Sequence, residues 1–182
     1  MITGPRASGT STVAFGLATD RWRAGLRTGF VDLQQIGFIA GGTHRHLAEP
    51  ALAVHQLAAL HGLMSDCGAE LLVVSGHLDA RTHDALRDAL PSAPVVVVRL
   101  RADKATIEAH VRGRARGSEV RLAGDDLLGA SSAHQADVVA TALSQQELLD
   151  AAAAEDLVLD VGGRSPADVV SDVERFLARP RR

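Results

Sequence analysis

Short apolar runs of strand-forming residues alternate with longer helical patterns along the 182-residue chain, and this alternation constrains the fold most. The apolar runs cover residues 1–3, 30–33, 70–75, 94–100 and 157–161. The helical patterns cover residues 10–24, 49–67, 81–89, 104–113, 133–153 and 165–178. Strands that alternate with helices form a parallel sheet covered by helices on both faces. The sequence therefore predicts one α/β domain over residues 1–182, a three-layer sandwich around a mostly parallel five-stranded sheet.

Two segments depart from this regular pattern. The run at 1–3 is short for a strand, which leaves open that the given sequence begins inside that strand. Residues 112–132 are rich in Arg, Gly and Ser and show no clear period, a pattern typical of a functional loop. Within this segment, Asp125 and Asp126 are expected to cap the following helix, with pairing to nearby arginines as the alternative.

Composition and charge exclude several classes of function. A net charge of -3, an aromatic content of 3% and the absence of Tyr provide neither a basic field nor a stacking platform for nucleic acid. The apolar runs are far shorter than the roughly 20 residues that cross a bilayer, and no signal peptide is recognisable. A single cysteine, Cys67, agrees with a reducing compartment. We therefore expect a cytoplasmic protein with no membrane or nucleic-acid partner.

The basic residues are almost all arginines. Of the 19 basic side chains only Lys104 is a lysine, and together with abundant Ala this indicates a GC-rich bacterial genome. The single lysine also limits which cation can serve a phosphate site.

A glycine-rich segment joins the first predicted strand to the first predicted helix. Its spacing fits the phosphate-binding motif G-x-x-x-x-G-K-[ST], except that Thr10 stands where the motif has lysine. Gly4 and Gly9 permit backbone angles that let successive N–H groups turn toward an anion, and the helix adds its positive end. Ser11 would place its hydroxyl on Mg²⁺. The candidate phosphate-binding residues are Gly4, Pro5, Arg6, Ala7, Ser8, Gly9, Thr10, Ser11 and Thr12.

The missing lysine weakens this site. The motif's ammonium group makes charge-assisted hydrogen bonds worth about 1.5–3 kcal/mol each. Lys104 lies far along the chain, so Arg6 or an arginine from residues 112–121 is the candidate replacement. The alternative is that residues 4–12 form a strand-to-helix turn with no ligand.

These residues together resemble the P-loop kinase group, which includes the nucleotide, shikimate and gluconate kinases. The resemblance implies a P-loop NTPase-like fold that uses ATP and Mg²⁺. It implies that Asp32, at the end of the second strand, faces the acceptor substrate, and that an arginine-bearing lid at about 112–132 contributes Arg112 and Arg116 to catalysis. It also implies that Gly163 and Arg164 border the adenine. Ser75 stands where the group's third strand commonly ends in Asp.

The resemblance predicts an ATP-dependent phosphotransferase that acts on a small hydroxylated or nucleotide acceptor. The alternative is a nucleotide-binding pseudokinase or regulatory module with little or no transfer activity. It is favoured because Thr10 and Ser75 depart from the motif and Gln34 stands where several relatives carry a second acidic residue. An α/β scaffold that binds no phosphate is a third hypothesis. For Asp32 the alternative is a turn-capping role, and for the lid a solvated loop. The identity of the acceptor stays open, as does assembly into a homodimer.

Overall fold

A computed structural model describes residues 1–36, 50–117 and 126–179 of the chain. Within these ranges the chain forms five strands and six helices. The strands are β1 (Ile2–Thr3), β2 (Thr28–Asp32), β3 (Leu71–Ser75), β4 (Val98–Arg101) and β5 (Leu157–Asp160). The helices are α1 (Thr10–Arg23), α2 (Pro50–Asp66), α3 (Ala80–Ala89), α4 (Lys104–Ala115), α5 (Ser132–Ala152) and α6 (Pro166–Leu177).

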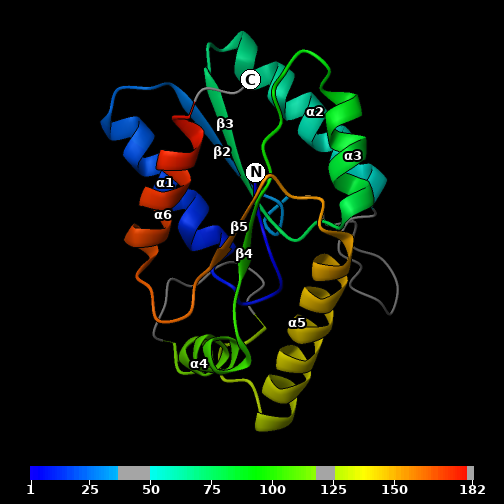
Figure 1. Ribbon diagram of the computed structural model, residues 1–182, viewed down its shortest axis with the longest axis vertical. Coiled ribbons are helices and arrows are strands. Elements are labelled where there is room, and N and C mark those ends of the chain that lie inside the picture. Colours follow the sequence, from blue (N-terminus) through cyan, green and yellow to red (C-terminus); the bar gives the residue numbers. More distant parts are fainter. Residues whose placement is uncertain (37–49, 118–125, 180–182) are drawn as a thin grey trace.

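The five strands form one parallel sheet in the order β2-β3-β1-β4-β5 (Figure 1). Helices α1 and α6 cover one face of this sheet, and α2 and α3 cover the other. The predicted α/β fold with a parallel five-stranded sheet is therefore confirmed. None of the helices in the described ranges is both long enough and apolar enough to cross a membrane.

Two apolar clusters hold the three layers together. One joins α1 and α6 to the sheet through Leu17, Val170 and Ile2, all nearly or fully buried. The other joins α2 and α3 to the opposite face through Leu57 and Leu86. Because both faces of the sheet are covered, β3 is apolar at four successive positions, Leu71–Val74.

The strand order places a topological switch point at the central strand. From β1 the chain runs to β2 on one side of the sheet, and from β3 it crosses β1 to reach β4 on the other. In open parallel sheets the crevice outside the carboxyl ends of the strands at such a point is where ligands bind. The loop that follows β1 lies there, so residues 4–9 occupy the place where such sheets bind ligands.

Two predicted boundaries are wrong. The strand predicted at 94–100 begins only at Val98, because both neighbouring strands start at that level: Ile2 of β1 and Leu157 of β5 are its partners. The first arginines of the predicted lid belong to a helix instead of a loop. Helix α4 continues through Gly113 to Ala115, and Gly117 follows with a positive φ of 76°.

Candidate functional site

The loop between β1 and α1 has a backbone conformation that few amino-acid sequences could adopt. Ala7 and Gly9 both lie in the left-handed region, with φ of 62° and 90°. A Cβ at Gly4 would lie 2.6 Å from Ser8 Oγ and 2.7 Å from the carbonyl oxygen of Leu100, closer than side-chain carbons approach. Only glycine therefore fits at position 4, and the turn brings the chain directly into α1.

Helix α1 begins without a side-chain cap. The N-cap residues of α3, α4, α5 and α6 are Asp79, Asp103, Ser131 and Ser165. Each of these side chains accepts a hydrogen bond from a backbone N–H of the first turn. At α1 the cap position is Gly9, which has no side chain to accept one. The first N–H groups of a helix need acceptors, and an anion at this end satisfies them and interacts favourably with the helix dipole.

The space in front of the loop suits phosphate oxygens. A Cβ at Gly9 would meet no other atom within 4 Å, so the loop faces open space there. Two buried hydroxyls, Ser8 Oγ and Ser75 Oγ, have no hydrogen-bond partner in the described part of the chain. A buried hydroxyl without a partner is costly, so each of these two lacks an acceptor that it needs. The open side of the loop, at Gly9, is where an anion could approach it.

Two histidines hold the loop from outside. His77, just beyond β3, donates from Nδ1 to the carbonyl oxygen of Gly4 at 3.1 Å. His110 of α4 donates from Nδ1 to the carbonyl oxygen of Ala7 at 2.8 Å. A carbonyl oxygen only accepts, so each ring carries its proton on Nδ1 in these bonds. Sequence reasoning missed both residues, because neither lies in a motif and each contacts the loop across a long stretch of chain.

Arg6, the one cationic side chain of the loop, is held by an acidic partner. Its guanidinium pairs with Asp126, and Asp126 Oδ2 also accepts a hydrogen bond from His134 Nε2 at 3.0 Å. Burial acts to raise the pKa of Asp126, but Arg6 and His134 outweigh it and lower that pKa below its ordinary value. Asp126 is therefore a carboxylate at neutral pH. The prediction that Asp126 caps α5 is wrong, because Ser131 occupies the cap position.

Asp32 lies at the carboxyl end of β2, next to Ser75 in the parallel register. Its side chain is buried at 7% exposure, and Oδ1 accepts a hydrogen bond from the Gln34 N–H at 2.9 Å. The carboxylate thus caps its own turn and also lies at the edge of the sheet that carries the loop. Across residues 1–36, 50–117 and 126–179, no three acidic, His or Cys side chains gather as a metal site.

Known structures share this architecture over nearly the whole chain. An APS kinase from Mycobacterium tuberculosis, in complex with AMPPNP and APS, is 17% identical, with a TM-score of 0.56 over 98% of this chain and 95% of that one. A gluconokinase from Sinorhizobium meliloti is 16% identical, with a TM-score of 0.59 over the same shares. The fold is that of the P-loop kinases. An uncharacterized protein from Eubacterium ventriosum is 11% identical, with a TM-score of 0.56 over 97% of this chain and 95% of that one.

Comparison of the sequence alone found no match: no protein-family model matches the chain, and no curated protein matches it. At identities this low the structural match establishes the P-loop kinase fold alone, and the chemistry depends on the residues described above.

Two arginines predicted to belong to a lid, Arg112 and Arg116, lie in α4 and at its C-cap. Arg112 pairs with Glu108 one turn earlier at 3.7 Å and is largely exposed. His110 faces the loop, and Arg112, two residues later, points to another side of the helix. Arg116 is the C-cap of α4 and is exposed. Residues 118–125 of the predicted lid lie outside the described ranges.

The loop predicted to border the adenine follows β5 at the same edge of the sheet. Gly163 has a φ of 67°, which suits glycine in this turn. Arg164 contacts two residues of α6. Its guanidinium pairs with Asp172 Oδ2 at 2.5 Å and donates to the carbonyl oxygen of Asp168 at 3.2 Å. The structure therefore anchors Arg164 to α6, and β4 lies between this loop and the loop that follows β1.

Proposed function

We propose that the protein is an ATP-dependent phosphotransferase that moves the γ-phosphoryl group of ATP to a small hydroxylated or nucleotide acceptor. The observation that carries this proposal is the uncapped start of α1, which follows a loop with two left-handed residues at the switch point of the sheet. Every other helix whose cap is described satisfies its first turn with a side chain. An anionic ligand is the natural partner of the one that does not.

Different residues of the chain would bind the nucleotide phosphates and position the acceptor. Backbone N–H groups of Ala7 and of residues 9–11 would hold the phosphates, because the Ser8 N–H already donates to the carbonyl oxygen of Pro5 at 3.2 Å. The Ser8 hydroxyl would be an added donor, and Ser11 Oγ would bind Mg²⁺. Bound Mg²⁺·ATP supplies the activated phosphoryl group and neutralises part of its charge. Asp32 would orient the acceptor hydroxyl and take its proton. Arg6 would supply the positive charge that Thr10 lacks, after its guanidinium leaves Asp126.

The structural neighbours support the class of reaction and leave the acceptor open. One neighbour is an APS kinase in complex with AMPPNP and APS, and the other is a gluconokinase. Acceptor pockets are built from loops and helix faces without a transferable code. We therefore assign a phosphoryl acceptor with a free hydroxyl and no narrower class.

A second function has specific support. Thr10 replaces the motif's lysine, and the buried Ser75 stands at the end of β3 where a carboxylate would help to hold Mg²⁺. Both changes remove groups that stabilise the phosphoryl group during transfer, while the backbone groups of the loop are kept. A nucleotide-binding pseudokinase is the function that this observation favours.

A transfer assay separates the two functions. The protein is incubated with Mg²⁺ and ATP labelled at the γ-phosphoryl, together with a panel of sugar acids, nucleosides and nucleotides. A phosphotransferase forms labelled product, and Ser11→Ala lowers that rate while leaving the unfolding midpoint unchanged. Binding of ATP with no labelled product and no phosphate release would identify the pseudokinase. No binding at all would overturn both.

A further inference from the structure

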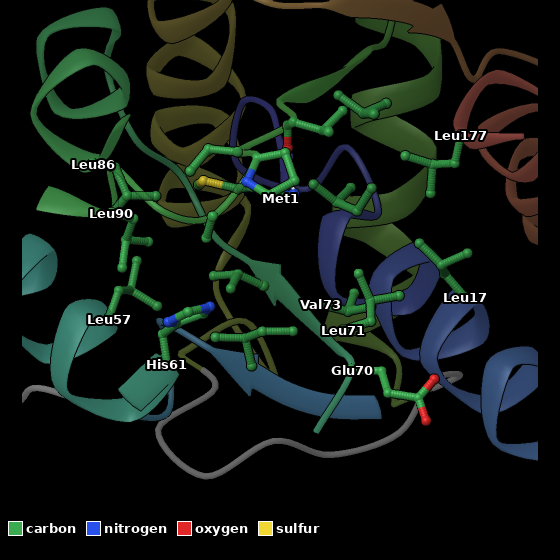
Figure 2. A pocket seen from close by; sticks show the side chains of 18 of the residues that line it. Met1, Leu17, Leu57, His61, Glu70, Leu71, Val73, Leu86, Leu90 and Leu177 are labelled. Carbon is green, nitrogen blue, oxygen red and sulfur yellow. The ribbon is translucent and has the colours of Figure 1, made fainter. Parts of the chain in front are cut away.

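A cavity of about 310 Å³ lies at the amino ends of β3 and β4, at the edge of the sheet opposite to the phosphate loop of residues 4–9 (Figure 2). Figure 2 shows Leu57 and Leu86 on one side of this cavity and Leu17 and Leu177 on the other. None of the residues assigned to ATP lines it. The side chains that position the phosphate loop therefore belong to other parts of the fold.

One backbone N–H of the phosphate loop is bound by a distant helix. The N–H of Arg6 donates to Gln145 Oε1 of α5 at 2.9 Å, across 139 residues of sequence. Within the loop itself, the Ser8 N–H donates to the carbonyl oxygen of Pro5 at 3.2 Å. These two N–H groups already have acceptors, so the role of holding phosphates falls to the other N–H groups of the loop.

Gln145 differs from the other side chains that bind the backbone of the loop. His77 and His110 donate to carbonyl oxygens of the loop at 3.1 and 2.8 Å, whereas Gln145 accepts. A glutamine amide accepts a hydrogen bond without carrying a charge. A carboxylate could make the same bond, but its charge would repel a phosphate in the loop. The neutral acceptor therefore suits an anion site.

The helix that carries Gln145 also holds the side chain of Arg6. His134 of α5 binds Asp126, and Asp126 pairs with the Arg6 guanidinium. His134 and Gln145 lie about three helical turns apart, so they share one face of α5. Buried apolar residues between them anchor the helix to the core. Helix α5 thus holds both the backbone and the side chain of one loop residue.

We propose that Gln145 is a positioning residue of the phosphate site. By holding the Arg6 N–H, it fixes the peptide group between Pro5 and Arg6, next to the left-handed Ala7, and keeps the following N–H groups turned toward the phosphates. A loop that is ordered before its ligand arrives loses less conformational entropy on binding, which raises the affinity. This inference rests on the proposed function, because it gives Gln145 a role toward a phosphate ligand. The effect passes through the backbone of residue 6 and not through its guanidinium.

Hydrogen exchange of the Arg6 amide tests the contact without any nucleotide. Gln145→Met removes the acceptor at nearly constant side-chain length, and we expect the Arg6 amide to exchange about tenfold or more faster. Gln145→Glu keeps an acceptor oxygen at the same place, so it should keep the amide protected. Unchanged exchange of this amide in Gln145→Met would overturn the proposal.

Gln146 provides a matched control on the same helix. Its Oε1 accepts the N–H of Ala102 at 3.0 Å, and Ala102 follows β4 and lies outside the phosphate loop. Gln146→Met therefore removes the same kind of bond at a similar cost to folding. We expect it to leave the Arg6 amide and the ATP affinity nearly unchanged. Equal loss of ATP affinity in both methionine variants would show that the two glutamines are merely structural and would overturn the proposal.

Calorimetric titration with ATP tests the role toward the ligand. Gln145→Met should weaken ATP binding about three- to tenfold. The loss should be the same in an Arg6→Ala background, because the contact is made by the backbone. Gln145→Glu should also weaken binding, but through its charge, so that only its loss shrinks as salt is raised. A loss in Gln145→Met that disappears in the Arg6→Ala background would overturn the proposed route through the backbone.

The two measurements separate the role of Gln145 from the proposed function. If the unchanged protein does not bind ATP at millimolar concentration, the proposed function fails, and the role of Gln145 toward a phosphate fails with it. If ATP binds, but neither the Arg6 amide nor the ATP affinity responds to Gln145→Met, only the role of Gln145 fails.

Discussion

His110 on α4 donates a hydrogen bond from Nδ1 to the carbonyl oxygen of Ala7, 2.8 Å away and 103 residues earlier in the chain. Ala7 lies at the turn of the phosphate loop with a φ of 62°. The left-handed region costs a non-glycine residue about 1–2 kcal/mol, so this conformation needs support from its surroundings. The histidine bond is part of that support, and it links α4 to the loop that would hold the phosphates.

Replacing this histidine is expected to loosen the loop. His110→Ala should weaken ATP binding about two- to tenfold, because a single neutral hydrogen bond contributes about 0.5–1.5 kcal/mol. Calorimetric titration with ATP measures the change. The matched control is the double variant with Ala7→Gly, since glycine adopts the same φ without strain. The double variant should recover much of the affinity, and a failure to recover any would show that His110 does not act through Ala7.

Asp126 is expected to compete with a phosphate for Arg6. In the structure the guanidinium pairs with Asp126, and that pair is about one-third exposed. Asp126→Asn should release Arg6 and tighten ATP binding about two- to fivefold, the range of a partly exposed ion pair. The effect should shrink as salt is raised.

The same substitution in an Arg6→Ala background provides the control for this competition. If Arg6 mediates the effect, Asp126→Asn changes nothing in that background. Weaker ATP binding by Asp126→Asn alone would mean that the pair holds Arg6 in its working position, contrary to this account.

Restoring the lysine should strengthen the site. Thr10→Lys adds the ammonium group at the first residue of α1, and we expect ATP to bind roughly tenfold or more tightly from one charge-assisted hydrogen bond. Thr10 is 9% exposed, so a longer side chain also changes the packing there. Thr10→Met has similar length without charge and separates the two effects. Equal affinities of the two variants would count heavily against a phosphate at this loop.

His83 makes the stability of the protein depend on pH. It is fully buried, its ring nitrogens have no hydrogen-bond partner in the described structure, and burial together with Arg87 lowers its pKa to about 4. The ring is neutral in the folded chain but takes a proton near pH 6.5 when unfolded. Stability contributed by this group is therefore complete above pH 6.5 and falls as the pH drops toward 4.

Urea unfolding at pH 7 and pH 5 measures this dependence. His83 should account for about 2 kcal/mol of the loss between these two values. His83→Leu, which cannot titrate, should lose less stability over the same interval. An identical loss in the variant would show that His83 does not carry the pH dependence.

The local features of this fold could be predicted from the sequence. Gly4 and Gly9 mark the loop, because a side chain at Gly4 would clash and the φ of 90° at Gly9 suits glycine. Ser165 with Pro166 marks the start of α6, where Ser165 forms a capping box with Asp168. These signals lie within a few residues of the structure that they determine.

Features that depend on distant partners could not be predicted. His77, His110 and Asp126 reach the loop across 73, 103 and 120 residues, and no spacing in the sequence encodes those contacts. The valines at 95–97 have strong strand propensity but stay outside β4, because a ladder forms only where a neighbouring strand is present.

Titration of the protein with ATP, with and without Mg²⁺, tests the central claim most directly. The uncapped start of α1 and the open loop predict binding in the micromolar range that tightens with Mg²⁺. Ser11→Ala should abolish the tightening and leave the Mg²⁺-free affinity nearly unchanged. No heat and no thermal stabilisation at millimolar ATP would contradict the claim and leave residues 4–12 as a strand-to-helix turn without a ligand.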